Sequence, residues 1–191
     1  MTSEKEEPGA WGGIHICGKA HTNAEGGKGS SEIGGAVYGG NDDADNSGTL
    51  QYIRLEYTGF AFDEEHEANG ISFYGVGNGT IVDHCEAYKG SDDGFEFFGG
   101  SVNVSNMVVV SCSDDSFDWT EGWNGKGTDL VAYQEAKATL GYDCDCLIEA
   151  TITKTTMQPL PYRIPYSKTS SSQVTAKANK ASVCVAALKP I

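Results

Sequence analysis

The sequence has few basic side chains, no long apolar run and no convincing helical periodicity. Its 191 residues include 13 Lys and Arg against 27 Asp and Glu, a formal net charge of −14. A surface this acidic repels phosphate groups, so we expect no nucleic-acid partner. The apolar stretches, among them Met107–Val110, are far shorter than the roughly 18 residues needed to cross a bilayer, so we expect no transmembrane segment.

Other features are absent as well. The first residues, Met1-Thr-Ser-Glu-Lys-Glu-Glu7, contain neither the basic n-region nor the apolar core of a signal peptide. The six cysteines are too irregularly spaced to indicate a disulfide framework in a chain of this length. We expect Cys85 and Cys112 to be buried as small apolar side chains.

The end of the chain lacks glycine, aspartate and glutamate altogether. All 25 glycines and all 27 acidic residues lie in residues 1–150, whereas residues 151–191 hold four of the five prolines. The formal charge divides at the same place, with −20 for residues 1–150 and +6 for residues 151–191. We therefore expect residues 1–150 to form the fold and residues 151–191 to be a disordered or poorly structured tail.

One internal repeat is clear in the acidic region. Ser91-Asp-Asp-Gly-Phe-Glu-Phe97 recurs 22 residues later as Ser113-Asp-Asp-Ser-Phe-Asp-Trp119. The same displacement superimposes two strand-like stretches, Cys85–Lys89 and Met107–Ser111. Such a period is typical of one coil of a solenoid, in which equivalent side chains of successive coils lie above each other.

Short strands and glycine turns account for much of the remaining acidic region. Residues 52–57 alternate apolar with charged side chains, the period of two expected of a half-buried strand. Glycine clusters at 75–79, 99–100 and 122–127 supply turns with positive φ. We expect the long Gly/Asp-rich stretch at 21–48 to be a loop outside the solenoid wall.

The acidic region resembles parallel β-helix regions of secreted or lipid-anchored surface proteins of Bacteroidetes-type bacteria. The segments that carry this resemblance are Pro8–Ile14, Asn46–Tyr57, Asn69–Ile71, Gly79–His84 and the Ser-Asp-Asp repeat with Phe98–Gly100. The resemblance implies an all-β, right-handed parallel β-helix over about residues 2–150, with an extracellular or cell-surface location. It also implies that the solenoid is incomplete at both ends, and we expect such uncapped ends to self-associate.

The same resemblance suggests an origin for the tail. Relatives continue beyond the position of Ala150 with an Asp-Asn-Asn stretch. When Thr151–Ile191 is back-translated with permitted codons and read from the last base of the Ala150 codon, it can encode a Gly/Asp-rich sequence without a stop. We therefore interpret residues 151–191 as a frame-shifted segment outside the family fold.

The repeat brings two groups of acidic side chains together. The acidic set is Asp92, Asp93, Glu96, Asp114, Asp115, Asp118 and Glu121. Stacked carboxylates repel one another, which favours a bound cation, raised pKa values or full solvation. Calcium is the natural candidate because it accepts many oxygen ligands in flexible geometry, and the expected ligands are Asp92, Asp93, Asp114 and Asp115. The alternative is turn chemistry, in which aspartate side chains cap backbone amides.

Aromatic residues gather around the same repeat, among them Trp119 and Trp123. Exposed rings beside carboxylates would offer a platform for sugar rings. The alternative is that the rings pack between coils as a stacking ladder, as the phenylalanines at matching positions of the repeat indicate.

Three functional hypotheses follow. The leading one is a secreted or surface-displayed binding or structural protein, with a glycan or calcium as ligand and no catalytic activity. The second is a polysaccharide-acting hydrolase using paired carboxyl groups, or a lyase whose proton acceptor would be Arg54 or Lys89. The third is a truncated, frame-shifted fragment without function.

The frame-shift interpretation predicts a property of the gene. Its nucleotide sequence should contain an open, Gly/Asp-rich reading that begins at the last base of the Ala150 codon. A stop codon early in that frame would refute the interpretation, and sequencing the DNA decides it.

Overall fold

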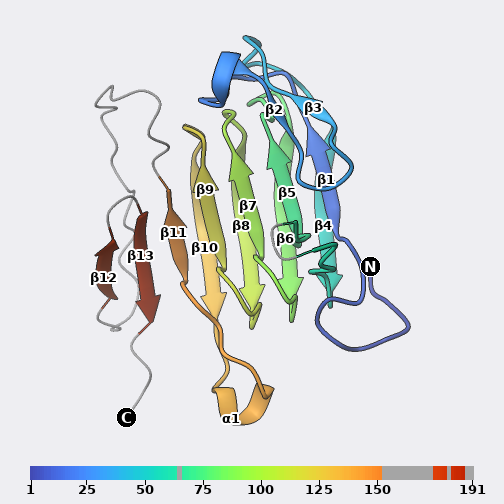
Figure 1. Ribbon diagram of the computed structural model, residues 1–191, viewed down its shortest axis with the longest axis vertical. Coiled ribbons are helices and arrows are strands. Elements are labelled where there is room, and N and C mark those ends of the chain that lie inside the picture. The colour runs from blue at the N-terminus through green and yellow to red at the C-terminus, as the bar shows by residue number, and fades with distance from the viewer. Residues whose placement is uncertain (64–65, 152–173, 180–181, 188–191) are drawn as a thin grey trace.

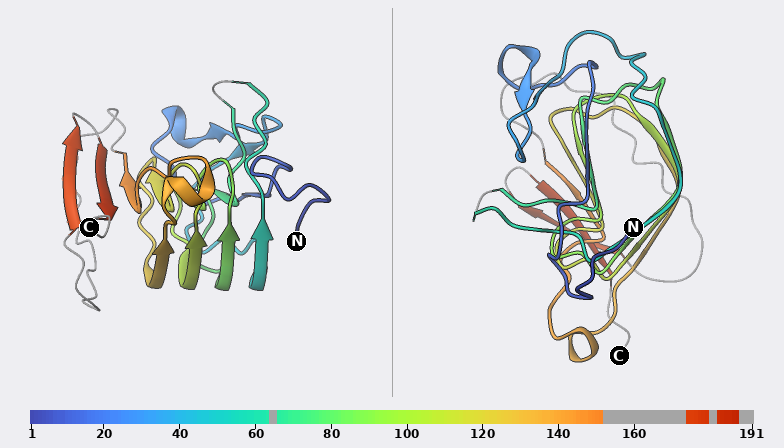
Figure 2. Two further views of the ribbon diagram at one scale, coloured as in Figure 1. Left: turned by 90° about the horizontal axis from the view of Figure 1, so that it is seen from below. Right: turned by 90° about the vertical axis from the view of Figure 1, so that its right-hand side faces the viewer.

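The chain forms a stack of β-strand coils (Figure 1). The computed structural model describes residues 1–63, 66–151, 174–179 and 182–187. One parallel sheet contains, in spatial order, β1 (Ile14–Cys17), β5 (Ile71–Tyr74), β7 (Phe95–Phe98), β9 (Phe117–Thr120) and β11 (Ile148–Ala150). A second parallel sheet contains β4 (Thr49–Glu56), β6 (Ile81–Tyr88), β8 (Asn103–Val110) and β10 (Gly127–Tyr133). The chain visits the two sheets in turn, which confirms the expected parallel β-helix (Figure 2, right).

Successive coils pair in the register that the repeat predicts. On β7 and β9, Phe95 lies opposite Phe117 and Glu96 lies opposite Asp118. In the second sheet, Glu86 of β6 lies opposite Val108 of β8, again 22 residues further along the chain. The repeat of the sequence is therefore one coil of the solenoid.

One left-handed residue bends each strand of the second sheet. These four residues have φ values of 53° to 54°, and they are Tyr52, His84, Asn106 and Asp129. They occupy equivalent positions in neighbouring strands. The bend shifts the alternation of inward and outward side chains, so that Val82 and Cys85 of β6 both face the core although they are three residues apart. The period of two therefore holds on each side of the bend and is interrupted at the bend.

Aromatic and aliphatic side chains fill the space between the two sheets. Phe97 stacks between Phe73 and Trp123, with ring centroids 5.0 Å and 4.5 Å away. Phe95 stacks on Phe117 of the next coil at 5.8 Å, which confirms the ladder interpretation of the repeat. Cys85 and Cys112, each 1% exposed, are buried as expected. The core is thus built from side chains that repeat along the solenoid axis.

Residues 21–48 connect β1 to β4 outside the two parallel sheets. This loop holds the short helix η1 (Glu25–Gly27) and a hairpin of β2 (Gly29–Ser30) and β3 (Val37–Tyr38). The turn from β7 to β8 uses Gly99 and Gly100, with φ values of 63° and 80°. A Cβ on Gly99 would lie 2.8 Å from the carbonyl oxygen of His21, so the loop packs against a turn that requires glycine.

The segment expected to be a tail is described only in part. Its strands β12 (Val174–Asn179) and β13 (Ser182–Ala187) form an antiparallel pair, and Val185 of β13 lies opposite Ile148 of β11. Residues 152–173, 180–181 and 188–191 lie outside the described residues, and the expected disorder there stays a prediction. The helix α1 (Lys137–Leu140) precedes β11, and no helix of the described chain is long and apolar enough to span a membrane.

Truncation of the aromatic ladder should cost stability. Phe97→Ala removes a ring that is 2% exposed and stacked on two others, and we expect a loss of about 3–5 kcal/mol in the free energy of unfolding. The control Tyr133→Ala truncates a side chain that is 59% exposed and should change stability by less than about 0.5 kcal/mol. Equilibrium unfolding in urea measures both, and equal effects of the two variants would contradict the stacked core.

Candidate functional site

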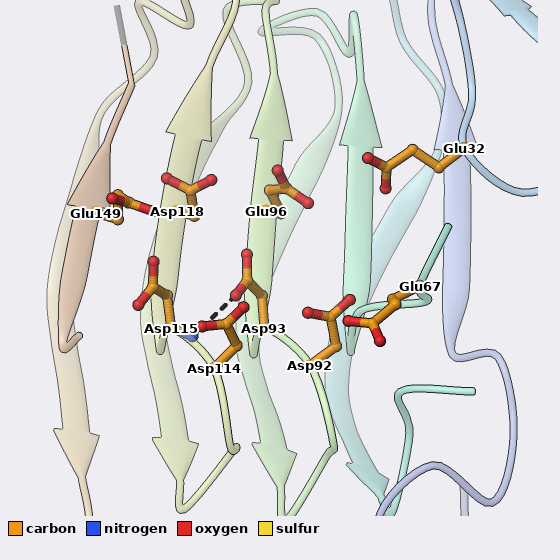
Figure 3. Close-up of a pocket in the computed structure, with 9 residues that line it drawn as sticks. All are labelled: Glu32, Glu67, Asp92, Asp93, Glu96, Asp114, Asp115, Asp118 and Glu149. Carbon is orange, nitrogen blue, oxygen red and sulfur yellow. Dashed lines mark hydrogen bonds between the residues drawn. The ribbon is translucent and has the colours of Figure 1, made fainter. Parts of the chain in front are cut away.

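A pocket on the outer face of the first sheet is lined entirely by carboxyl side chains. Its volume is about 210 Å³. The lining residues are Glu32, Glu67, Asp92, Asp93, Glu96, Asp114, Asp115, Asp118 and Glu149 (Figure 3). We call this pocket the acidic groove.

Strand alternation and register create one row of the acidic groove. Phe95 and Phe97 of β7 point into the core, so Glu96 between them points outward. Glu96 lies opposite Asp118 of β9, and Asp118 lies opposite Glu149 of β11. Neighbouring strands are about 4.8 Å apart, so these three side chains form a row across adjacent coils (Figure 3).

A second row lies just before the strands and is held by backbone amides of the next coil. The amide of Asp115 donates a hydrogen bond to Oδ1 of Asp93 at 2.9 Å, and the amide of Cys146 donates one to Oδ1 of Asp115 at 2.7 Å. Asp93 and Asp115 therefore cap backbone amides of the next coil. Both carboxyl groups nevertheless line the acidic groove, so capping and groove formation coexist.

Two loops complete the groove. Glu32 comes from the turn between β2 and β3, and Glu67 comes from the segment that precedes β5. Figure 3 shows both side chains at the end of the groove nearest β5. The groove is therefore a composite of coil residues and loop residues.

Burial and mutual repulsion raise the pKa values of the groove carboxyls. The pKa is about 7 for Asp92, about 8 for Asp115 and about 6 for Asp118, against an ordinary value of 3.8. Loss of hydration is the largest cause in each case, and neighbouring carboxylates add to it. The pKa values of Asp93 and Glu96 are also raised well above their ordinary range, for the same reasons. Without a compensating cation, the groove therefore retains protons near neutral pH.

Two buried oxygens at the groove have no hydrogen-bond partner. They are Oδ1 of Asp118, whose residue is 8% exposed, and Oδ1 of Asn69, whose residue is 1% exposed. Nδ2 of Asn69 donates to Oε2 of Glu96 at 2.6 Å, which holds that carboxyl group in place. A buried unpaired acceptor costs about 1–3 kcal/mol, and a bound cation would supply the missing partner for Asp118.

Carboxylate oxygens come close enough for metal coordination in three sets. Within each set, one ligand atom of every residue lies within 4.8 Å of the others. The first set is Asp92, Asp93 and Asp114; the middle set is Asp93, Glu96 and Asp118; the third set is Asp115, Asp118 and Glu149. The structure thus brings three of the four expected calcium ligands into one set and assigns Asp115 to another.

Glu121 does not belong to the acidic groove, which corrects its expected role in binding. Its Oε2 accepts hydrogen bonds from the hydroxyls of Thr22 at 2.5 Å and Tyr38 at 2.9 Å. These bonds anchor the loop 21–48 to the solenoid wall. A position three residues after Asp118 puts the side chain past the end of β9, beyond the row of carboxyl groups.

The expected aromatic platform also requires correction. Trp123 is 7% exposed, stacks on Phe97 and donates its indole N–H to the carbonyl oxygen of Val102. Trp119 is half-buried and packs against the same core. Alternation along β9 directs Trp119 to the side opposite Asp118, so these rings pack behind the groove.

The basic residues considered for a lyase lie elsewhere. Arg54 of β4, in the second sheet, pairs with Glu56 and Glu86 at 2.6 Å each. Lys89 follows β6 and pairs with Glu135 at 3.1 Å. Neither residue lines the acidic groove.

Sequence reasoning missed Glu32, Glu67, Glu149 and the supporting residue Asn69. Glu149 continues the row of Glu96 and Asp118, but the connection through α1 lengthens that coil and hides the position from a fixed 22-residue period. Glu32 and Glu67 lie on loops without a repeat. The only available signal was Asn69, which stands in one of the segments that carry the family resemblance.

Comparison with known proteins identifies the architecture. The family whose model matches residues 1–183 is described as a pectate-lyase-like β-helix domain. The match extends past Ala150 into the segment that composition sets apart, and the boundary expected there stays a prediction. No curated protein and no solved structure gives a significant match. The narrower likeness to bacterial surface lipoproteins also stays a prediction.

The raised pKa values predict how stability depends on pH in the presence of a chelator. Carboxyls whose pKa is raised on folding add stability that is fully present below their unfolded pKa, near 3.8, and is lost as pH rises through 6 to 8. We expect the melting temperature to fall between pH 5 and pH 8.5. The double variant Asp92→Asn/Asp115→Asn should flatten this profile, and a profile identical to that of the unsubstituted chain would contradict the assignment.

Proposed function

Since the chain belongs to the family of pectate-lyase-like β-helix domains, we propose that it is a binding protein whose acidic groove takes up divalent cations, above all calcium. The observation that carries the proposal is the three sets of carboxylate oxygens within 4.8 Å. Each set joins residues of different coils, so one ion would connect parts of the wall that are distant in sequence.

The donor atoms favour calcium over other common ions. All residues that line the groove offer carboxylate oxygens, and neither histidine nor cysteine is among them. Zinc prefers nitrogen and sulfur ligands, while magnesium requires near-ideal octahedral geometry and retains water. Calcium accepts six to eight oxygens in flexible geometry, which suits a groove built from both strands and loops.

Electrostatics gives the cation a clear role. Two ionised carboxylates 4.8 Å apart repel by roughly 3–4 kcal/mol at an effective dielectric constant of about 20. A divalent cation between them replaces this repulsion with attraction to both. Because the ligands come from successive coils, the binding free energy would add to the stability of the fold.

The proposal extends to location and partner. We place the protein outside the cell or on its surface, where calcium-binding modules work at millimolar calcium. We take a glycan as its partner, because hydroxyl and carboxylate oxygens of a sugar complete the coordination of a bound calcium ion. A groove loaded with cations would also repel acidic sugars less strongly.

One observation keeps a hydrolase as the second candidate. Asp118, with a pKa of about 6, lies in the same groove as Asp115, with a pKa of about 8, and two carboxyls with separated pKa values suit a general acid and base. Incubation with a panel of neutral and acidic polysaccharides tests this candidate. Cleavage that is abolished by Asp115→Asn and by Asp118→Asn would establish an enzyme and overturn the account of a binding protein.

A thermal melt tests cation binding directly. Calcium at about 100 times its dissociation constant stabilises a native protein by about 2.7 kcal/mol, which corresponds to a rise of roughly 5–10 °C in melting temperature for a domain of this size. The rise should be larger at pH 8 than at pH 5, because protons compete for the same carboxylates.

Matched variants separate specific binding from a general salt effect. Asp118→Asn removes a buried ligand charge and should reduce the calcium-dependent rise. Asp129→Asn removes an exposed charge on β10 and should leave the rise unchanged. If calcium does not raise the melting temperature of the unsubstituted chain, the proposal is wrong.

A further inference from the structure

We infer that the acidic groove binds two cations at the same time, one at each end. This inference rests on the cation binding proposed above and goes further, because it fixes the number of ions and their separate ligands. The first ion would lie among Asp92, Asp93 and Asp114, and the second among Asp115, Asp118 and Glu149.

The two end sets share no residue. The middle set overlaps both of them, because it takes Asp93 from the first and Asp118 from the third. An ion at the middle position would therefore compete with both end ions for a ligand. Occupation of the two ends uses six different carboxyl groups and leaves Glu96 between them.

The two end sites belong to different pairs of coils. Asp92 and Asp93 precede β7 and Asp114 precedes β9, so the first site joins the turns before these strands. The second site joins Asp115, just before β9, and Asp118 of β9 to Glu149 on β11. Figure 3 shows Asp92 and Glu149 at opposite sides of the groove, with Asp114 between Asp93 and Asp115.

Charge also favours two ions over one. The six ligands of the end sites carry a formal charge of −6 when ionised, and one divalent cation would leave three of them uncompensated at the other end. Glu32, Glu67 and Glu96 add further negative charge to the same groove. No basic side chain among the lining residues offsets that charge.

A separate observation points to a ligand at Asp118, which belongs to the second site and to the middle set. Oδ1 of Asp118 is buried and has no hydrogen-bond partner, while its residue is 8% exposed and lines the groove. Asn69 positions Glu96 through the 2.6 Å hydrogen bond to Oε2, which places a fixed carboxyl group between the two sites.

Binding stoichiometry tests the inference. Calcium is titrated into the full chain, freed of metal by a chelating resin, with isothermal titration calorimetry and equilibrium dialysis as independent measurements. We expect two calcium ions per chain. Asp92→Asn changes only the first site and Glu149→Gln only the second, so each variant should bind one ion, whereas the control Asp129→Asn should bind two.

The possible outcomes are distinct. One ion per unsubstituted chain overturns the inference and leaves the proposed function intact, whereas no binding removes both. Loss of both ions in either single variant also overturns it, because the sites would then not be separate. Each substitution removes one charge from a crowded group, so melting in chelator should show folded variants, and the stoichiometry of the unsubstituted chain decides the question by itself.

Discussion

Stacking of coils in register is the constraint on which the rest of this structure depends. Parallel pairing sets each side chain directly against its equivalent in the next coil, at about the 4.8 Å spacing of neighbouring strands. On the inner face this produces favourable contacts, such as the stacking of Phe95 on Phe117. On the outer face it forces Glu96 against Asp118 and Asp118 against Glu149. One geometric rule therefore produces both the core and the acidic groove.

The groove carboxyls serve the fold and the site together. Asp93 and Asp115 each use one oxygen to accept an amide hydrogen bond from the following coil, which aligns that coil for pairing. The same residues line the groove and contribute to its repulsion. Architecture and ligand binding are thus compatible uses of one aspartate, because a carboxylate has two oxygens and several acceptor sites.

Loops turn a repetitive wall into a specific site. Glu121 holds the loop 21–48 in place by accepting hydrogen bonds from the hydroxyl groups of Thr22 and Tyr38. Glu32, which belongs to this loop, thereby lies at the groove. Glu67 arrives in the same region from the segment before β5. A regular solenoid alone would offer only the rows of the strands, whereas these insertions give one end of the groove a different shape.

The sequence by itself determined the parallel β-helix, its register and most of the acidic set, because a 22-residue repeat of Ser-Asp-Asp places like residues in like positions of a coil. Tertiary structure decided which of those side chains meet. It placed Glu121 under a loop and Trp123 in the core. It also brought Glu149 next to Asp118, although the coil between them is longer than the 22-residue repeat. Periodicity reports only the position of a residue within a repeat, whereas loop anchorage and irregular coil lengths depend on contacts between segments far apart in the chain.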